Sequence, residues 1–181
     1  DGETILRAAE NISPYLINGP NVLVQPASKP LAGVNEMSFG NMPNEGGQLL
    51  LTYDEAEDAI DHHNVMPRFI RPFVGSQEFI RGIERRCIWV TDQDYAEARA
   101  NEFLASRFEA VRSQRAASNR ATTNELAKSP HRFGEIRQTG SETVIAIAAI
   151  SSENRDYLPC GLLPPGTIMS NKCYALYDAP L

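Results

Sequence analysis

Short apolar segments separated by polar turns run through the chain and predict a mixture of strands and helices. Residues 143–151 give the strongest strand pattern, because they are apolar on both faces and so suit a central strand. Residues 133–138 alternate between apolar and polar positions and predict another strand. Strands and helices follow one another without regular βα alternation. The predicted class is therefore α+β, with a mixed, largely antiparallel sheet and a few flanking helices.

A capping box predicts where the first long helix begins. Thr52 and Glu55 have the spacing at which each side chain can bond the other's backbone, so we expect a helix over residues 53–63. Residues 4–12 place several apolar side chains on one side and predict a short helix near the N-terminus.

A second long helix is predicted after Thr91, which has the residue type of an N-cap. Leu104, Phe108 and Val111 are spaced i, i+4, i+7 and form its buried stripe. At about 100° per residue, Arg115 projects close to the same stripe. We therefore expect Arg115 at the edge of the core, bound to an acid.

The charge distribution changes the picture more than the total does. The net charge is −6, yet residues 64–137 hold 13 basic and 9 acidic side chains, a local excess of +4. Of the 17 basic residues in the chain, 14 are arginine. Arginine makes bidentate contacts to phosphate and guanine, so the middle of the chain is a candidate nucleic-acid surface. Ordinary surface ion pairs would explain the same composition.

Motifs for catalysis and metal binding are missing from the sequence. No glycine-rich loop lies between a strand and a helix, so no nucleotide cofactor site is expected. The three cysteines, Cys87, Cys160 and Cys173, are widely spaced and odd in number, which disfavours a disulfide framework or a zinc site. The longest apolar run, residues 144–150, is far shorter than the roughly 20 residues that span a bilayer. We expect a cytoplasmic protein without a membrane partner.

Many segments resemble the target-recognition region of the MmeI-like family, single-chain bacterial enzymes that combine restriction with adenine methylation. They occur in the family's order and cover most of the chain. The matching segments are Asn11 to Val22, Lys29 to Leu31, Met37 to Asn41, Gly46 to Leu51, Arg68 to Gly82, Cys87 to Trp89, Ser129 to Gln138 and Ser151 to Pro159.

The resemblance implies a sequence-specific recognition module for double-stranded DNA within a larger type II (type IIL/IIG) restriction endonuclease and adenine-N6 DNA methyltransferase. Residues 1–13 would end a preceding, methyltransferase-side segment, and residues 14–181 would form the target-recognition domain. The parent enzyme would use S-adenosylmethionine and Mg²⁺, with neither bound by these 181 residues, which would not be an enzyme alone. The expected partners are DNA and the methyltransferase and nuclease domains of the same chain.

Two groups of residues are predicted to contact DNA. A polar tip follows the central strand, and its residue types match the hydrogen-bond patterns of base edges. The predicted base-reading residues are Arg137, Gln138, Glu153, Asn154 and Arg155. The region after residue 107 is rich in arginine and in side chains that donate to phosphate oxygens. The predicted backbone contacts are Arg112, Arg120, Lys128, His131 and Arg132. A structural Glu153–Arg155 ion pair that closes a turn is the alternative at the tip.

Two other functions remain open on the sequence alone. A protein-interaction or structural domain without DNA contact would have its arginines scattered over the fold and paired with acids. A hydrolase would need the thiol of Cys87 or Cys160 within hydrogen-bond reach of His131 in a cleft.

Overall fold

The computed structural model describes residues 5–23, 25–27, 29–30, 33, 35–152 and 154–179. The chain divides into two compact units, Asp1–Gly33 and Val34–Leu181. In the first unit, Ile12 forms an isolated bridge with Asn18, and none of the described residues is helical. The predicted helix over residues 4–12 is therefore wrong for its described part. Leu6 is 95% exposed, so the apolar side of that segment is not buried as a helix would need.

The second unit contains two four-stranded sheets. The first sheet has the order β1-β8-β5-β6 and is antiparallel throughout. Its strands are β1 (Ser38–Phe39), β8 (Cys173–Tyr177), β5 (Val144–Ala148) and β6 (Cys160–Leu163). Because β5 has a partner on both sides, the prediction of a central strand in this region is confirmed.

The second sheet has the order β2-β4-β3-β7, and only its β3–β7 pair is parallel. Its strands are β2 (Leu50–Thr52), β4 (Arg85–Ile88), β3 (Ile70–Val74) and β7 (Ile168–Met169). The α+β class and the largely antiparallel pairing are confirmed, with two sheets where the sequence predicted one.

Strand β7 contributes to both hydrophobic cores. Successive strand residues point to opposite faces, and here Ile168 packs in the larger core while Met169 packs in the smaller one. The larger core contains the second sheet together with Leu104, Phe108 and Val111. The position of β7 is therefore fixed by packing in both cores.

Helices α1 (Tyr53–Asp61) and α2 (Ser76–Arg81) follow strands directly, and a short 3-10 turn, η1 (Pro67–Phe69), precedes β3. The capping box at α1 is confirmed, since Thr52 Oγ1 accepts from Glu55 N at 3.1 Å and Glu55 Oε2 accepts from Thr52 N at 2.8 Å. No helix in the described part of the chain is both long and apolar enough to cross a membrane.

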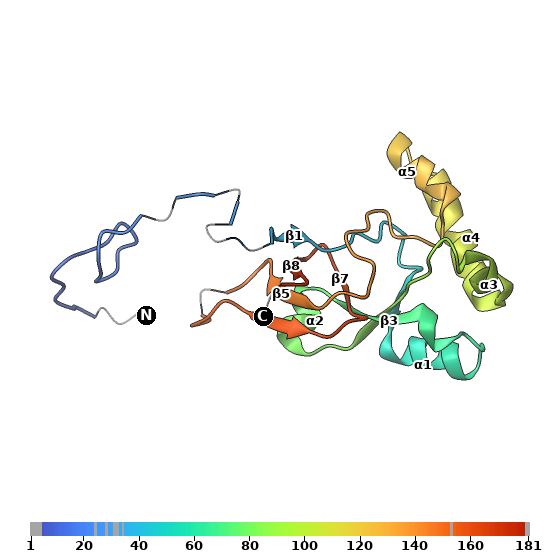
Figure 1. Ribbon diagram of the computed structural model, residues 1–181, viewed down its shortest axis with the longest axis horizontal. Coiled ribbons are helices and arrows are strands. Elements are labelled where there is room, and N and C mark those ends of the chain that lie inside the picture. Colours follow the sequence, from blue (N-terminus) through green and yellow to red (C-terminus); the bar gives the residue numbers. More distant parts are fainter. Residues whose placement is uncertain are drawn as a thin grey trace. The chain divides into compact units, whose positions relative to one another are not determined.

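The predicted second helix is two helices, α3 (Tyr95–Ala100) and α4 (Glu102–Ala116). The break occurs at Asn101, whose side chain caps α4 by accepting from Leu104 N at 3.1 Å. Helix α5 (Ala121–Glu125) and the 3-10 turn η2 (Leu126–Lys128) pack against α4. Figure 1 shows α5 next to α4. The buried stripe Leu104, Phe108 and Val111 lies on α4 as predicted.

Residues 133–138 do not form a strand, which corrects the prediction. Their only ladder contact is an isolated bridge between Glu135 and Met42, and Gly134 N donates to Pro43 O at 2.8 Å. Pro43 has no N–H to continue the ladder. The segment is held instead by hydrogen bonds to Pro43, Met42 and Asn41.

Candidate nucleic-acid interface

Residues 126–139 form one continuous segment, which begins with η2 and carries five of the ten predicted contact residues. Arg115, on α4, anchors one end of this segment. Its side chain is fully buried, where the helical spacing predicted a place at the edge of the core, and the expected acid partner is wrong. All the hydrogen bonds that its guanidinium donates go to main-chain carbonyls.

A buried amide pair anchors the other end. Arg137 N donates to Asn41 Oδ1 at 2.7 Å, and Asn41 Nδ2 donates to Gln138 Oε1 at 2.8 Å. Gln138 Oε1 also accepts from Met169 N at 2.8 Å, and Gln138 Nε2 donates to Thr167 O at 2.8 Å. The main chain at residues 137–138 is therefore fixed against β7.

This arrangement separates the roles of two neighbouring predicted base readers. Gln138 is 6% exposed and uses both ends of its amide inside the protein, so base reading by Gln138 does not fit its placement. The side chain of Arg137 is half exposed, and within the described residues its one hydrogen-bonded partner is Glu135, at 3.0 Å. A rigid main chain under a half-exposed guanidinium, held only by an exposed ion pair, is the placement that base recognition requires.

His131 is part of an aromatic cluster beneath the segment. Its ring stacks on Tyr95 at 4.1 Å between centroids and meets Phe108 edge-on. Its Nε2 lies 2.8 Å from Asp92 Oδ1, while its Nδ1 is buried without a hydrogen-bond partner among the described residues. His131 is 4% exposed, which leaves it almost no surface for a phosphate. This burial favours a structural role for His131, and its backbone contact stays a prediction.

Burial governs the charge of this imidazole. It lowers the pKa of His131, against the opposing effect of the Asp92 hydrogen bond. A neutral ring that bonds Asp92 must carry its proton on Nε2, which leaves Nδ1 as an acceptor. The same bond, with Arg132, lowers the pKa of Asp92. Arg132 Nη1 donates to Asp92 Oδ2 at 2.7 Å, so one carboxylate connects the buried ring to a surface cation.

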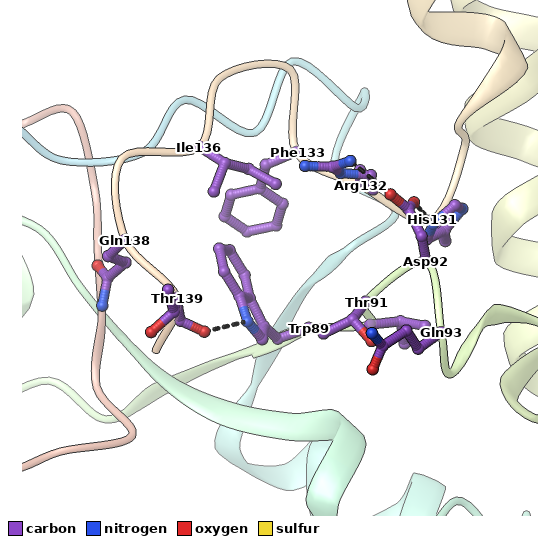
Figure 2. A pocket seen from close by; sticks show the side chains of 11 residues that line it. Trp89, Thr91, Asp92, Gln93, His131, Arg132, Phe133, Ile136, Gln138 and Thr139 are labelled. Atoms are coloured by element: carbon purple, nitrogen blue, oxygen red, sulfur yellow. Dashed lines mark hydrogen bonds and ion pairs between the residues drawn. The ribbon is translucent and has the colours of Figure 1, made fainter. Parts of the chain in front are cut away.

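A hollow of about 420 Å³ lies beside this cluster. Figure 2 shows Phe133 above Trp89, whose Nε1 donates to Thr139 O at 3.3 Å, with Arg132, His131 and Asp92 together at one side. The apolar floor is formed by Trp89, Phe133 and Ile136, and the rim is polar. The predicted contact segment therefore borders a concave surface.

The remaining predicted backbone contacts lie on α4, α5 and η2. Arg112 donates to Glu109 Oε2 at 2.9 Å, and Lys128 pairs with Glu125 at 2.5 Å. Arg120 is exposed, and its guanidinium has no hydrogen bond or ion pair within the described residues. Arg112, Lys128, Arg132 and Arg137 thus have one acid partner each within the described residues. Such pairing is what we expected of an interaction domain, and Arg120 does not follow it.

The tip after β5 is exposed. Asn154 N and Arg155 N both bond Ser152, at 3.2 Å to its Oγ and 3.1 Å to its carbonyl. Arg155 borders a hollow of about 300 Å³ that Gln77 and Arg81 of α2 also line. Glu153 lies outside the described residues, so the geometry of its predicted pair with Arg155 is not part of the described structure.

The arrangement that a thiol hydrolase needs is not present among the described residues. Cys87 is buried, which raises the pKa of its thiol, and Cys160 is exposed on β6. His131 Nε2 is bonded to Asp92, and no hydrogen bond joins either cysteine to the ring.

Sequence reasoning missed Asn41, although it supports Arg137 directly. Asn41 is fully buried within a loop rich in Pro, Gly and Asn, and nothing in the local sequence pattern marks it as a buried polar residue. The only available signal was its place in a segment that resembles the MmeI-like family.

Comparison with known proteins agrees with that resemblance. A family model described as "MmeI, target recognition domain" matches residues 18–181. DNA methyltransferase A of Bacillus subtilis (strain 168) is 38% identical over 175 residues, which cover 97% of this chain and 20% of that protein. A solved structure of the type IIL restriction-modification enzyme MmeI in complex with DNA matches with a TM-score of 0.79 and 32% identity, over 99% of this chain and 24% of that chain.

The chain thus spans about a fifth of the curated relative and about a quarter of the solved enzyme. The matched region leaves out only the first 17 residues. The resemblance predicted from the sequence is confirmed, and the chain belongs to the MmeI target recognition domain family.

Proposed function

We propose that this chain recognises a specific base sequence in double-stranded DNA, as one domain of a longer bacterial restriction-modification methyltransferase. The observation that carries the proposal is the placement of Arg137. Its side chain is half exposed, while its main chain is fixed by Asn41 and by the buried amide of Gln138. Membership of the MmeI target recognition domain family, and a neighbour solved with DNA, support the same conclusion.

Arg112, Arg120, Lys128 and Arg132 contact the DNA backbone in this proposal. Three of them pair with one exposed or half-exposed acid each, and such pairs contribute only about 0–1 kcal/mol. Exchanging a carboxylate for a phosphate therefore costs little. Arg120 needs no exchange and offers its full fork of donors to a phosphate.

Arg137, Asn154, Arg155 and Glu153 read base edges in this proposal. Arginine pairs with O6 and N7 of guanine, glutamate accepts from the amino group of cytosine, and asparagine suits adenine. In this proposal Glu153 and Arg155 address the two bases of one G·C pair, because their residue types suit cytosine and guanine.

Chemistry belongs to other parts of the parent protein in this proposal. The parent would transfer a methyl group from S-adenosylmethionine to adenine N6 and would cut DNA with Mg²⁺. The described residues do not fit the metal, since no group of three His, Cys, Asp or Glu side chains among them could hold one. The chain would not be an enzyme on its own, and it would act in the cytoplasm beside the methyltransferase and nuclease domains.

A salt series with the full-length protein tests the proposal. Plasmid DNA from cells that express the protein is sequenced for methylated adenines, and a short duplex that carries the methylated sequence is the binding probe. We expect tighter binding to this duplex than to one with a single changed base pair, by about 1–3 kcal/mol. The logarithm of the association constant should fall by about 0.9 per contacted phosphate for each tenfold rise in salt. Equal affinity for both duplexes, or binding unaffected by salt, would contradict the proposal.

A further inference from the structure

Arg115 is a fully buried cation, and within the described residues its guanidinium donates hydrogen bonds to main-chain carbonyls only. Nε donates to Asn44 O at 2.9 Å, and Nη1 donates to Leu126 O at 3.1 Å and Ser129 O at 3.0 Å. Nη2 donates to Pro43 O at 3.2 Å and Arg132 O at 2.7 Å. A guanidinium has five N–H donors, so every donor is used.

Placing a charge in this position is costly. Burial lowers the pKa of Arg115, with only a partial offset from the charge of Glu45, and no carboxylate lies within ion-pair distance among the described residues. A buried charge without a counter-ion persists only when its hydrogen bonds compensate fully. An apolar side chain would fill the same volume without that cost, so packing alone does not account for Arg115.

The carbonyls that Arg115 holds belong to the predicted DNA-contacting segment. Leu126 and Ser129 enclose Lys128, and Arg132 is itself a predicted backbone contact. Pro43 O also accepts from Gly134 N at 2.8 Å. The carbonyl that Arg115 binds therefore also holds the main chain three residues before Arg137. Asn124 Nδ2 donates to the carbonyls of Arg115, Ala116 and Ser118, so α5 attaches to the same helix end.

We infer that Arg115 is a positioning residue for DNA recognition: it fixes residues 126–137 in the shape in which their cations meet DNA. The inference rests on the proposed function. Lysine cannot replace the guanidinium, because its three donors lie on one nitrogen and cannot reach carbonyls on opposite sides of a planar fork.

Arg115→Lys in the full-length protein tests the inference, with Val111→Ala as a matched control. Val111 is buried on α4 one turn before Arg115, and it contacts no predicted DNA residue through a polar bond. Its truncation destabilises the same helix without touching the carbonyls. Thermal unfolding of both variants sets a temperature at which each is folded. Binding to the methylated-sequence duplex and to its one-base-pair variant is then measured at that temperature across a salt series.

We expect Arg115→Lys to weaken binding to the specific duplex by about tenfold, to reduce discrimination between the two duplexes and to lower the salt slope. Val111→Ala should keep the discrimination and the salt slope of the wild type. Asn124→Ala removes a second attachment from a mostly surface position and should give a smaller change of the same kind, which keeps the test available if Arg115→Lys does not fold.

Wild-type discrimination with Arg115→Lys, or an equal loss with Val111→Ala, would overturn the inference and leave the proposed function standing. A wild-type protein that does not discriminate between the duplexes would instead refute the proposed function. The two failures are thereby distinguished by the wild-type measurement.

Discussion

Nε2 of the buried His131 lies 2.8 Å from Oδ1 of the exposed Asp92, so a core imidazole shares a carboxylate with the protein surface. The second oxygen of that carboxylate holds Arg132, a predicted DNA contact. The protonation of His131 in the core and the position of Arg132 at the surface therefore both depend on the Asp92 carboxylate.

The burial of His131 predicts a loss of stability in mild acid. Its pKa in the folded state is lowered, so below the unfolded value of about 6.5 the unfolded chain binds a proton that the folded chain does not. Stability is fully present above that value and falls as the pH drops toward the folded pKa, by up to about 1.4 kcal/mol per pH unit. Thermal unfolding from about pH 7.5 to about pH 5.5 measures the slope, and His131→Gln should be flatter. A wild-type chain with no slope over this range would refute the prediction.

Replacing Asp92 with Asn is expected to strengthen DNA binding. The change frees Arg132 from its 2.7 Å ion pair and removes a negative charge from the surface. Since Asp92 is largely exposed, stability should change by no more than about 1 kcal/mol. Binding by the full-length protein should tighten at every salt concentration, while the salt slope stays near the wild-type value because Arg132 contacts the same phosphate in both proteins. Asp94→Asn is the control, because Asp94 pairs with Arg68 instead; equal effects of both changes would show that Arg132 is not involved.

Gln138→Met should destabilise the chain by about 2–4 kcal/mol, because it leaves several buried polar groups without partners. Asn41 Nδ2, Met169 N and Thr167 O all bond the Gln138 amide, while methionine conserves its volume. Chemical denaturation measures the loss. Gln93→Met, at an exposed position, should stay within about 0.5 kcal/mol of wild type. A Gln138 variant as stable as the Gln93 variant would mean that the amide network contributes nothing.

Replacing both Arg112 and Arg120 with Ala should weaken binding to every DNA sequence about equally. Phosphate contacts carry no sequence information, so the salt slope should fall by up to about 1.8 while the discrimination between duplexes stays constant. Arg112 loses an exposed pair with Glu109 and a 3.4 Å hydrogen bond to the hydroxyl of Tyr95, and Arg120 loses no bond within the described residues, so stability should fall by no more than about 1 kcal/mol. A shift in the methylated sequence would count against a purely backbone role.

Local interactions were predictable from the sequence. The capping box of Thr52 and Glu55 lies within four residues, and the strand over residues 144–148 is specified by an unbroken apolar run. The helical angle of Arg115 likewise placed it beside the buried stripe, although we expected it at the edge of the core and it is fully buried. Each of these depends on neighbours in the chain or on a simple period, which is why one sequence was sufficient.

Long-range polar contacts were not predictable. The alternation of residues 133–138 predicted a strand, but their bonds go to Asn41, Met42 and Pro43, which lie about 90 residues away in a loop without periodicity. Arg115 was expected to bind an acid, since side-chain charges are visible in a sequence and carbonyl positions are not. The secondary structure could therefore be predicted from the sequence more fully than the conformation of the segment that positions the site.

Exchanging the residue types at Glu153 and Arg155 should change which sequence is methylated. In the proposal these side chains address one G·C pair, so Glu153→Lys with Arg155→Asp would place a donor where the acceptor stood and the reverse, which suits the inverted pair. The full-length variant is expressed in cells, and methylated adenines are mapped in their DNA. We expect sites changed at one base pair, with activity retained. If the two residues only close a turn after β5, the map would show the original sequence modified at an equal or lower rate, and base reading by this tip would be refuted.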